Sequence, residues 1–316
     1  MTKISDEKDR LILFELLQDC RQSLSKIAKA VNLPQQTVSY RIKRLEKSKV
    51  IKKYTININY SKLGYRRHTL YLDVKEISTE EVNKYIQQII DVKEVSCCHI
   101  LRDVSEWKLY ISIWTKTIEE YDKIQTKILN KFKNKVNNYL SFASIKSYTY
   151  FPRRLNPKKA PKVDIKEGIG ELTIKETDWK ILEKLKKNSK ISILDLAKEL
   201  NMRAKTVVRK IDLLKKKEII QRFYPLINPK KLGYNQYTFI SRIDPSYSKE
   251  IEEFIEFTKK DPRFTIVIRA VGYVNLSYSF LVKDDEELKE ILEKVEGILG
   301  KARLQNFKIE INDMVG

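Results

Sequence analysis

The sequence predicts an α+β protein made of two copies of one unit, each a basic three-helix module followed by a domain of β-α-β-β-α-β order. Shifting the chain by 169 positions aligns residues 1–65 with 170–234 without a gap, and 21 of those 65 positions are identical. Apolar residues then recur at helix and strand spacing in the same order in both copies. The third observation is charge: 63 Lys and Arg against 42 Asp and Glu give +21 over 316 residues, which indicates a polyanionic partner.

The repeat predicts where the domains begin and end. We expect the helical modules at residues 1–62 and 171–231, the β-α-β-β-α-β domains at 65–151 and 234–316, and a linker at 152–170. Residues 152–170 contain three prolines and two glycines with almost no apolar periodicity, which is typical of a mobile connector.

The first 55 residues of each copy have the spacing of three short helices. In the first copy Asn32-Leu33-Pro34 forms the turn before the third helix, and the alternating segment 53–60 follows as a strand. Three helices and a basic strand are the order of a winged helix-turn-helix. The side chains expected to face inward are Ile12, Leu13, Leu16, Ile27, Ala28, Val31, Val38, Ile42 and Leu45, and in the second copy Ile181, Leu182, Leu185, Leu194, Leu196, Leu200, Val207, Ile211 and Leu214.

The outward face of the third helix is predicted to bind double-stranded DNA. Residues 1–53 carry 13 basic and 6 acidic side chains and residues 170–222 carry 15 and 8, so each block is +7. Glutamine pairs with adenine edges and arginine with guanine, while threonine and tyrosine reach phosphate or methyl groups. The candidate contacts are Gln35, Gln36, Thr37, Tyr40, Arg41, Lys43, Arg44, Arg203, Lys205, Thr206, Arg209 and Lys210.

The second half of each copy predicts a ferredoxin-like fold, with helices on one face of an antiparallel sheet. In the first copy we expect strands at 69–74, 95–101, 108–114 and 143–150, with helices at 80–90 and around 118–132. In the second copy the strands are expected at 237–243, 264–271, 276–282 and 303–311, and the helices at 249–258 and 286–298. Tyr71, Trp107 and Tyr110 make the second face of the first sheet apolar as well, so this face requires a partner sheet.

The chain resembles the Lrp/AsnC family of prokaryotic transcription factors, over nearly its whole length and twice. The matching residues in the first copy are Asp9-x-x-Ile12-Leu13, Ile27-Ala28-Lys29, Thr37-Val38-x-x-Arg41-Ile42-x-x-Leu45, Ile51 and Leu63-Gly64-Tyr65, with counterparts from Asp178 to Tyr234. The resemblance implies a DNA-binding module and a RAM-type ferredoxin-like domain that self-associates through its sheet and binds a small, amino-acid-like effector. For this chain it implies an intramolecular pseudo-dimer, with assembly into a homodimer left open.

Two departures from the family pattern affect the sites. Where the family favours a serine before the recognition helix, this chain has Pro34 and Arg203, so a cap hydrogen bond is expected to be missing in both copies. The family's glycine-containing turn survives only in the second copy, which makes Gly272, Tyr273 and Asn275 the candidate effector contacts. The two recognition helices also differ from each other, so we expect unequal half-sites.

Two alternative functions remain open from the sequence. A nucleoid-type architectural protein would carry the same positive charge and coat DNA with little sequence preference. The chain also resembles siroheme decarboxylases, tetrapyrrole enzymes with the same two-module architecture, in which His99 and Arg102 would act on or hold the substrate. A further histidine expected in those enzymes is replaced by Val104, and the basic modules would then have no role.

Other classes receive no support from the sequence. The three cysteines (Cys20, Cys97 and Cys98) lack metal-ligand spacing, the chain has two histidines, and no glycine-rich phosphate loop or catalytic triad stands out. We therefore expect no enzyme activity, no metal and no cofactor. No apolar run is long enough for a membrane span, and the first residues lack the core of a signal peptide, so the expected location is the cytoplasm.

Overall fold

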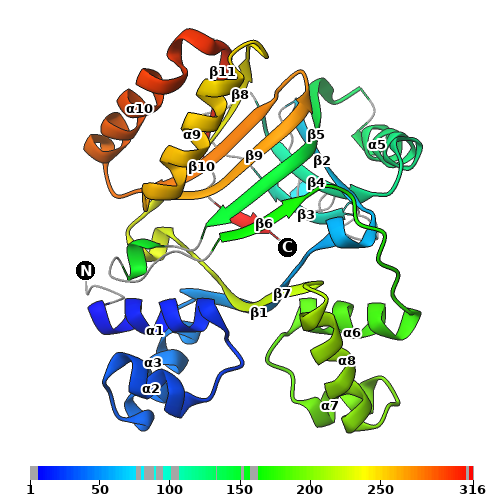
Figure 1. Cartoon of the computed structure of the whole chain (residues 1–316), viewed down its shortest axis with the longest axis vertical. Coiled ribbons are helices and arrows are strands. Elements are labelled where there is room, and N and C mark those ends of the chain that lie inside the picture. Colours follow the sequence, from blue (N-terminus) through cyan, green and yellow to red (C-terminus); the bar gives the residue numbers. More distant parts are fainter. Residues whose placement is uncertain are drawn as a thin grey trace. The chain divides into compact units, whose positions relative to one another are not determined.

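The computed structural model describes residues 6–75, 80–81, 89, 95–100, 107–132, 134–150, 153–156, 163–310 and 313–315. The chain divides into two units that interleave along the sequence. The head unit comprises Met1–Leu63, Phe151–Lys162 and Glu171–Gly233, and the sheet unit comprises Gly64–Tyr150, Val163–Gly170 and Tyr234–Gly316. The two copies therefore do not form two successive domains along the chain. Both helical modules belong to the head unit, and both β-rich domains belong to the sheet unit (Figure 1).

The head unit contains two three-helix modules, which we call the first and second head. Their helices are α1 (Glu7–Gln18), α2 (Leu24–Val31) and α3 (Gln35–Lys47) in the first head, and α6 (Glu176–Lys187), α7 (Ile193–Glu199) and α8 (Ala204–Lys216) in the second. Ser23 and Ser192 cap α2 and α7 by accepting backbone N–H groups. The predicted inward side chains are buried except Leu200, which is half-buried, and Leu194, which is 73% exposed; the expectation for Leu194 was wrong because Leu196 and Ala197 form the buried face of the short α7.

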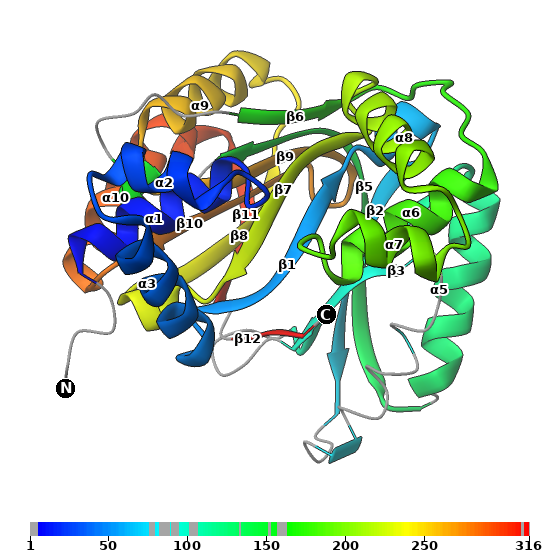
Figure 2. The ribbon, with the colours of Figure 1, turned by 90° about the horizontal axis from the view of Figure 1, so that it is seen from below.

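A two-stranded antiparallel ribbon joins the heads. It pairs β1 (Ile51–Ile58) with β7 (Ile220–Ile227), and in Figure 2 one three-helix group lies on either side of it. Thr55 lies opposite Tyr224, which is its own equivalent in the repeat, 169 positions later. Equivalent residues face each other in this way only at a two-fold axis. The heads are thus related by an internal two-fold axis through the ribbon.

Short 3-10 turns follow each strand of the ribbon. They are η1 (Tyr60–Leu63) after β1 and η3 (Lys230–Leu232) after β7. Gly64 and Gly233 end these turns with φ of +83° and +80°, a left-handed conformation that glycine adopts without steric cost. This requirement explains why a glycine occurs at this position in both copies.

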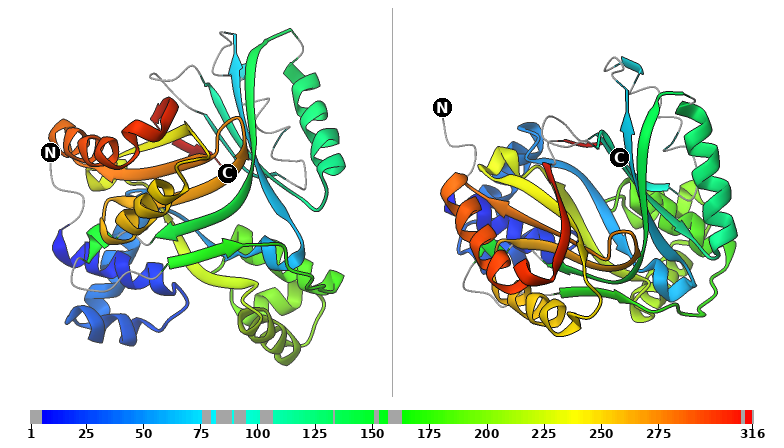
Figure 3. Two further views of the ribbon diagram at one scale, coloured as in Figure 1. Left: turned by 45° about the horizontal axis from the view of Figure 1, so that its top comes forward. Right: turned by 90° about the horizontal axis from the view of Figure 1, so that it is seen from above.

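The sheet unit contains a ten-stranded sheet with helices packed on it (Figure 3). Its strands are β2 (Arg66–Val74), β3 (Val95–Ile100), β4 (Leu109–Thr115), β5 (Val136–Tyr150), β6 (Val163–Glu167), β8 (Asn235–Ile243), β9 (Phe264–Gly272), β10 (Leu276–Val282), β11 (Arg303–Glu310) and β12 (Asp313–Val315). The helical elements are α5 (Ile118–Phe132), α9 (Ser248–Lys260), α10 (Asp285–Leu299) and η4 (Gly300–Ala302). Most of the helix predicted at 80–90 lies outside the described residues.

The strand order is β11-β8-β10-β9-β5-β2-β4-β3-β12, which gives each copy the order expected for a ferredoxin-like fold. The copies join twice, through β5 with β9 and through β12 with β3. At the first junction Gly272 has φ of +133°, and a Cβ there would lie 3.2 Å from both Phe142 Cβ and Ser141 O. The close approach of the two strands therefore requires a glycine at position 272.

Residues of both copies form one apolar cluster between the strands of the first copy and those of the second. Tyr71, Trp107 and Phe142 of the first copy pack with Ile240 and Ile268 of the second. On the opposite face of the first sheet, α5 covers Leu70, Leu72, Ile111 and Ile113, and α9 and α10 cover the equivalent face of the second copy. The apolar face of the first-copy strands that carries Tyr71 and Trp107, which the sequence predicted to need a partner sheet, is thus covered by strands of the second copy.

The segment predicted to be a mobile linker carries ordered structure, so that prediction was wrong for its described residues. Residues 153–155 form the 3-10 turn η2 (Arg153–Leu155), which contacts α1, and Leu155 is buried. Residues 163–167 form β6, which pairs antiparallel with the second half of β5. Strand pairing to β5 overrides the weak local signal of a segment rich in lysine and proline.

Candidate nucleic-acid interface

The recognition helices α3 and α8 begin without a side-chain cap. Pro34 and Arg203 occupy the N-cap positions, and neither side chain accepts a hydrogen bond from the helix, as the sequence predicted. The buried sides of the helices are equivalent: Val38, Ile42 and Leu45 in α3 match Val207, Ile211 and Leu214 in α8. Equivalent positions of α3 and α8 therefore form the exposed side of each helix.

A carboxylate of the first helix holds the middle of α3. Asp9 is fully buried and accepts hydrogen bonds from Arg41 Nη1 at 2.9 Å, from Arg44 Nη2 and from the backbone N of Asp6 at 3.2 Å. Arg41 also binds Asp6 Oδ2 at 2.7 Å, and its side chain is only 20% exposed. Burial raises the pKa of Asp6, but hydrogen bonds from Arg41 and the Asp9 backbone outweigh it, so the pKa is lowered.

The second head repeats this contact with a lysine. Lys210 Nζ lies 2.6 Å from Asp178 Oδ1, and Asp178 also accepts the backbone N–H of Lys175 at 3.0 Å. The prediction that Arg41 and Lys210 face outward was wrong, because both cations fold back onto the first helix of their own head. The identity Asp9/Asp178 did not reveal these ion pairs in advance, because an aspartate at N3 of the first helix is also explained by the capping hydrogen bond that both side chains accept from the backbone N–H of the N-cap residue.

The remaining candidate DNA contacts form the accessible face of the recognition helices. Thr37 and Thr206 are half-buried, and Arg44 is exposed although it is bound to Asp9. Gln35, Gln36, Tyr40, Lys43, Arg203, Lys205 and Arg209 are exposed. Their role in DNA binding remains a prediction, now resting on accessible side chains.

Matched backbone hydrogen bonds fix the heads against each other. Cys20 N donates to Phe223 O at 2.9 Å, and the equivalent Ser189 N donates to Tyr54 O at 3.1 Å. A second matched pair joins Asn59 N to Ile219 O at 2.8 Å and Asn228 N to Val50 O at 2.9 Å. Because every donor and acceptor has its equivalent 169 positions away, these bonds confirm the internal two-fold axis.

Side chains at this head–head contact follow the same axis. Cys20 Sγ and Ser189 Oγ, which are equivalent positions, lie 3.3 Å apart in the interior. Arg21 packs over the Phe223 ring at 5.5 Å, and its equivalent Lys190 packs over Tyr54 at 4.2 Å. The contact is isologous, as in a symmetric dimer, although one chain supplies both sides.

The candidate effector residues have structural contacts in the sheet unit. Asn275 Nδ2 donates to Ile243 O at 2.7 Å and its Oδ1 accepts from Ile243 N at 2.8 Å, so the amide bridges to the strand beside it. Tyr273 is exposed, hydrogen-bonds Gln305, and has Arg242 over its ring at 4.9 Å. Gly272 serves the close approach of β9 to β5. Tyr273 is thus the candidate with an exposed side chain, and effector binding stays a prediction.

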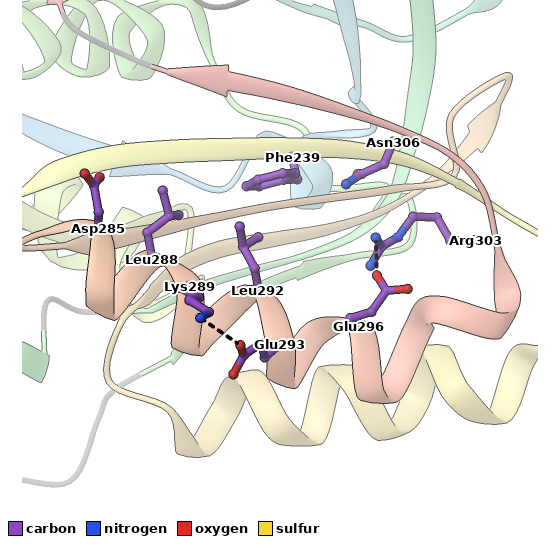
Figure 4. A pocket seen from close by; sticks show the side chains of 9 residues that line it. All are labelled: Phe239, Asp285, Leu288, Lys289, Leu292, Glu293, Glu296, Arg303 and Asn306. Carbon is purple, nitrogen blue, oxygen red and sulfur yellow. Dashed lines mark hydrogen bonds and ion pairs between the residues drawn. The ribbon is translucent and has the colours of Figure 1, made fainter.

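An open groove of about 560 Å³ lies elsewhere in the second copy, between α10 and strands β8 and β11 (Figure 4). Phe239, Leu288 and Leu292 give it an apolar floor, and Arg303 pairs with Glu296 at 2.7 Å at one end. The other lining residues are Asp285, Lys289, Glu293 and Asn306.

The fourth residue of the equivalent first-copy helix is Tyr121, whereas in α10 it is Leu288. Tyr121 stacks on His68 with ring centroids 4.1 Å apart and hydrogen-bonds Ser141. Burial, with a smaller contribution from the charge of Arg66, lowers the pKa of His68 to about 4. The two copies thus differ where this helix packs on the sheet. The first copy has the stacked pair Tyr121 and His68, and the second has Leu288 beside a groove.

Over the described residues no group of three His, Cys, Asp or Glu side chains could hold a metal ion, and no helix has the length and apolar character to cross a membrane. The side chain of His99 and the whole of Arg102 lie outside the described residues, so the structure does not test the tetrapyrrole contacts proposed for them.

Comparison with known proteins covers both halves of the chain. A family described as winged helix-turn-helix DNA-binding matches residues 5–52, and the MarR family matches residues 174–224. An uncharacterised HTH-type transcriptional regulator of Pyrococcus furiosus is 31% identical over 152 residues, 46% of this chain and 98% of that protein. The HTH-type transcriptional regulator LrpA of Pyrococcus abyssi is 34% identical over 128 residues, 39% of this chain and 85% of that protein. The chain belongs to the Lrp/AsnC family.

This Lrp/AsnC protein is about twice as long as those relatives, as a tandem repeat requires. Among solved structures, the siroheme decarboxylase NirDL matches 98% of this chain and 92% of its own, with a TM-score of 0.60 and 14% identity. At that identity the match shows a shared two-module fold and carries no information on activity. This Lrp/AsnC chain thus shares its duplicated fold with the siroheme decarboxylase NirDL.

Proposed function

We propose that this protein is a sequence-specific transcriptional regulator that binds double-stranded DNA with two recognition helices from one chain. The observation that carries the proposal is the pair of winged-helix heads related by an internal two-fold axis, each with an exposed polar and basic helix face. A two-fold pair of recognition helices suits a DNA site made of two half-sites. The names of the relatives and the net charge of +21 support the same function.

The proposal extends to regulation and assembly. A small amino-acid-like effector would bind the sheet unit, at the accessible Tyr273 or in the groove beside α10, and would change DNA affinity. Two chains would associate through their RAM-type domains into a homodimer with four heads. The protein would act in the cytoplasm and without a cofactor.

The decisive experiment measures binding of the full-length protein to fluorescent duplexes recovered from a randomised pool. We expect a short protected footprint, with affinity falling roughly a thousandfold between 50 and 200 mM salt, because two heads release many counterions. A uniform footprint ladder would instead favour the architectural function. Absence of binding to any duplex in dilute buffer would overturn the proposal.

The second candidate is a siroheme-decarboxylase-like enzyme, which the sequence resemblance raised and whose fold a solved siroheme decarboxylase shares over 98% of this chain. Its test is independent of DNA. The purified protein is titrated with an iron tetrapyrrole that carries carboxylate side chains and monitored in the Soret region. Tight stoichiometric binding, with decarboxylated product on incubation, would support the enzyme; unchanged spectra would exclude it.

A further inference from the structure

The two recognition helices place different chemistry at the positions where a helix-turn-helix reads bases. In such modules the N-terminal residues of the recognition helix contact base edges in the major groove. At these positions α3 has Gln35, Gln36 and Tyr40, and the equivalent residues of α8 are Ala204, Lys205 and Arg209. All except Ala204 are exposed. Two of the three neutral side chains of the first head, Gln36 and Tyr40, are therefore replaced by cations in the second.

The internal ion pairs sharpen this contrast. Arg41 is the cation in the N-terminal half of α3, and it binds Asp6 and Asp9. In α8 the equivalent Lys210 is held by Asp178, but Arg203, Lys205 and Arg209 remain exposed, and none forms an ion pair within the described part of the chain. The base-reading end of the first head is thus neutral and that of the second head carries three cations.

The C-terminal halves of the helices differ as well. Lys43 and Arg44 of α3 correspond to Asp212 and Leu213 of α8, and Leu213 is 50% exposed. Glu46 of α3 is in turn replaced by Lys215 of α8, so charges are rearranged along this half of the helices, while the exposed amides lie only at the N-terminal end of α3.

We infer that the two heads read different bases: the first head reads adenine through Gln35 and Gln36, and the second reads guanine through Arg209 and Lys205. The pairings follow from donor and acceptor geometry, since a glutamine amide matches N6 and N7 of adenine, and arginine or lysine matches O6 and N7 of guanine. The operator then consists of one adenine-containing and one guanine-containing half-site. This inference rests on the proposed DNA-binding function and specifies its target.

The test compares the operator recovered from the randomised pool with two palindromes built from its own halves. The wild-type chain should bind the natural operator about tenfold or more tightly than either palindrome. Gln35→Ala with Gln36→Ala should remove discrimination at the adenine half-site only, and Arg209→Ala at the guanine half-site only. Lys47→Ala and Lys216→Ala are matched controls, because a lysine occupies this exposed position in both helices and lies far from the base-reading end.

A gain-of-function variant keeps the test independent of folding losses. Gln35→Ala, Gln36→Lys and Tyr40→Arg together give α3 the residues that α8 has at these three base-reading positions, and this variant should prefer the palindrome of guanine half-sites. The inference is overturned if the recovered operator is itself palindromic, or if Arg209→Ala weakens all duplexes equally and lowers the salt slope by about one, as a phosphate contact would. Failure of the wild type to bind any duplex would instead reject the proposed function.

Discussion

The two heads agree where they contact each other and differ where they face solvent. The carboxylate of the first helix, the cation that it binds and the matched backbone bonds across the ribbon all recur 169 positions apart. On the exposed faces of α3 and α8, by contrast, Gln36, Tyr40 and Lys43 are replaced by Lys205, Arg209 and Asp212. The contacts that orient the recognition helices have been kept, and the residues that would determine the target have diverged.

The strongest test of the internal axis is a covalent link across it. Ser189→Cys places a thiol beside Cys20, whose Sγ lies 3.3 Å from Ser189 Oγ. On oxidation we expect an intramolecular disulfide, seen as faster migration without reductant, and stabilisation of the head unit by about 4 kcal/mol, because a very long loop is closed.

The disulfide experiment is done in a background with Cys97 and Cys98 changed to serine, and the same background with Ser189 retained is the control. Exclusively intermolecular cross-links would show that the two heads of one chain do not face each other. That result would contradict the internal two-fold axis.

The next largest effect tests whether the carboxylate that occurs in both heads contributes equally to the stability of each. Asp9→Ala should cost about 3 kcal/mol of stability, because it leaves two arginines without their buried partner. Asp178→Ala should cost about 1–2 kcal/mol, since one lysine depends on it and both side chains are partly exposed. Thermal unfolding followed by circular dichroism measures both, with the exposed Asp212→Ala as control. A smaller effect for Asp9 than for Asp178 would contradict this assignment.

The sheet unit offers a pH test of the difference between copies. Unfolded, His68 takes up a proton below about pH 6.5; folded, burial lowers its pKa to about 4. The unfolded state therefore binds more protons between these values, and the stability that His68 contributes falls by about 2–3 kcal/mol as the pH drops from 6.5 to 4.

The variant His68→Tyr adopts the residue of the second copy, Tyr237, and its unfolding should lose this part of the pH dependence. Identical pH profiles for the variant and the wild type would show that His68 is accessible to protons in the folded protein.

The smallest expected effect concerns the junction between copies in the sheet unit. Gly272→Ala should cost about 1–2 kcal/mol, because the backbone is left-handed there and the new Cβ meets Phe142. Gly297→Ala is the control, since a Cβ there meets no atom within 4 Å. Equal melting temperatures for the two variants would mean that β5 and β9 approach less closely than described.

Much of this architecture was predictable because it is local and occurs twice. The helices of both heads and the strands of the second copy follow from apolar spacing, and strand 276–282 was predicted at the bounds of β10. Two features were not predictable. Pairing of β1 with β7 joins segments 169 residues apart, and neither strand carries a local signal for its partner. Arg41 borders the buried stripe of α3, and spacing alone does not reveal that its long side chain turns back to Asp9.

The ribbon between the heads has an evolutionary consequence. In an ordinary symmetric dimer a substitution at the axis changes both sides at once, because one gene encodes both subunits. Here Thr55 faces Tyr224, and Cys20 faces Ser189, so each side of the axis mutates separately. A single chain of this kind gains a heterodimer's freedom to specialise without having to find a second gene product in the cell.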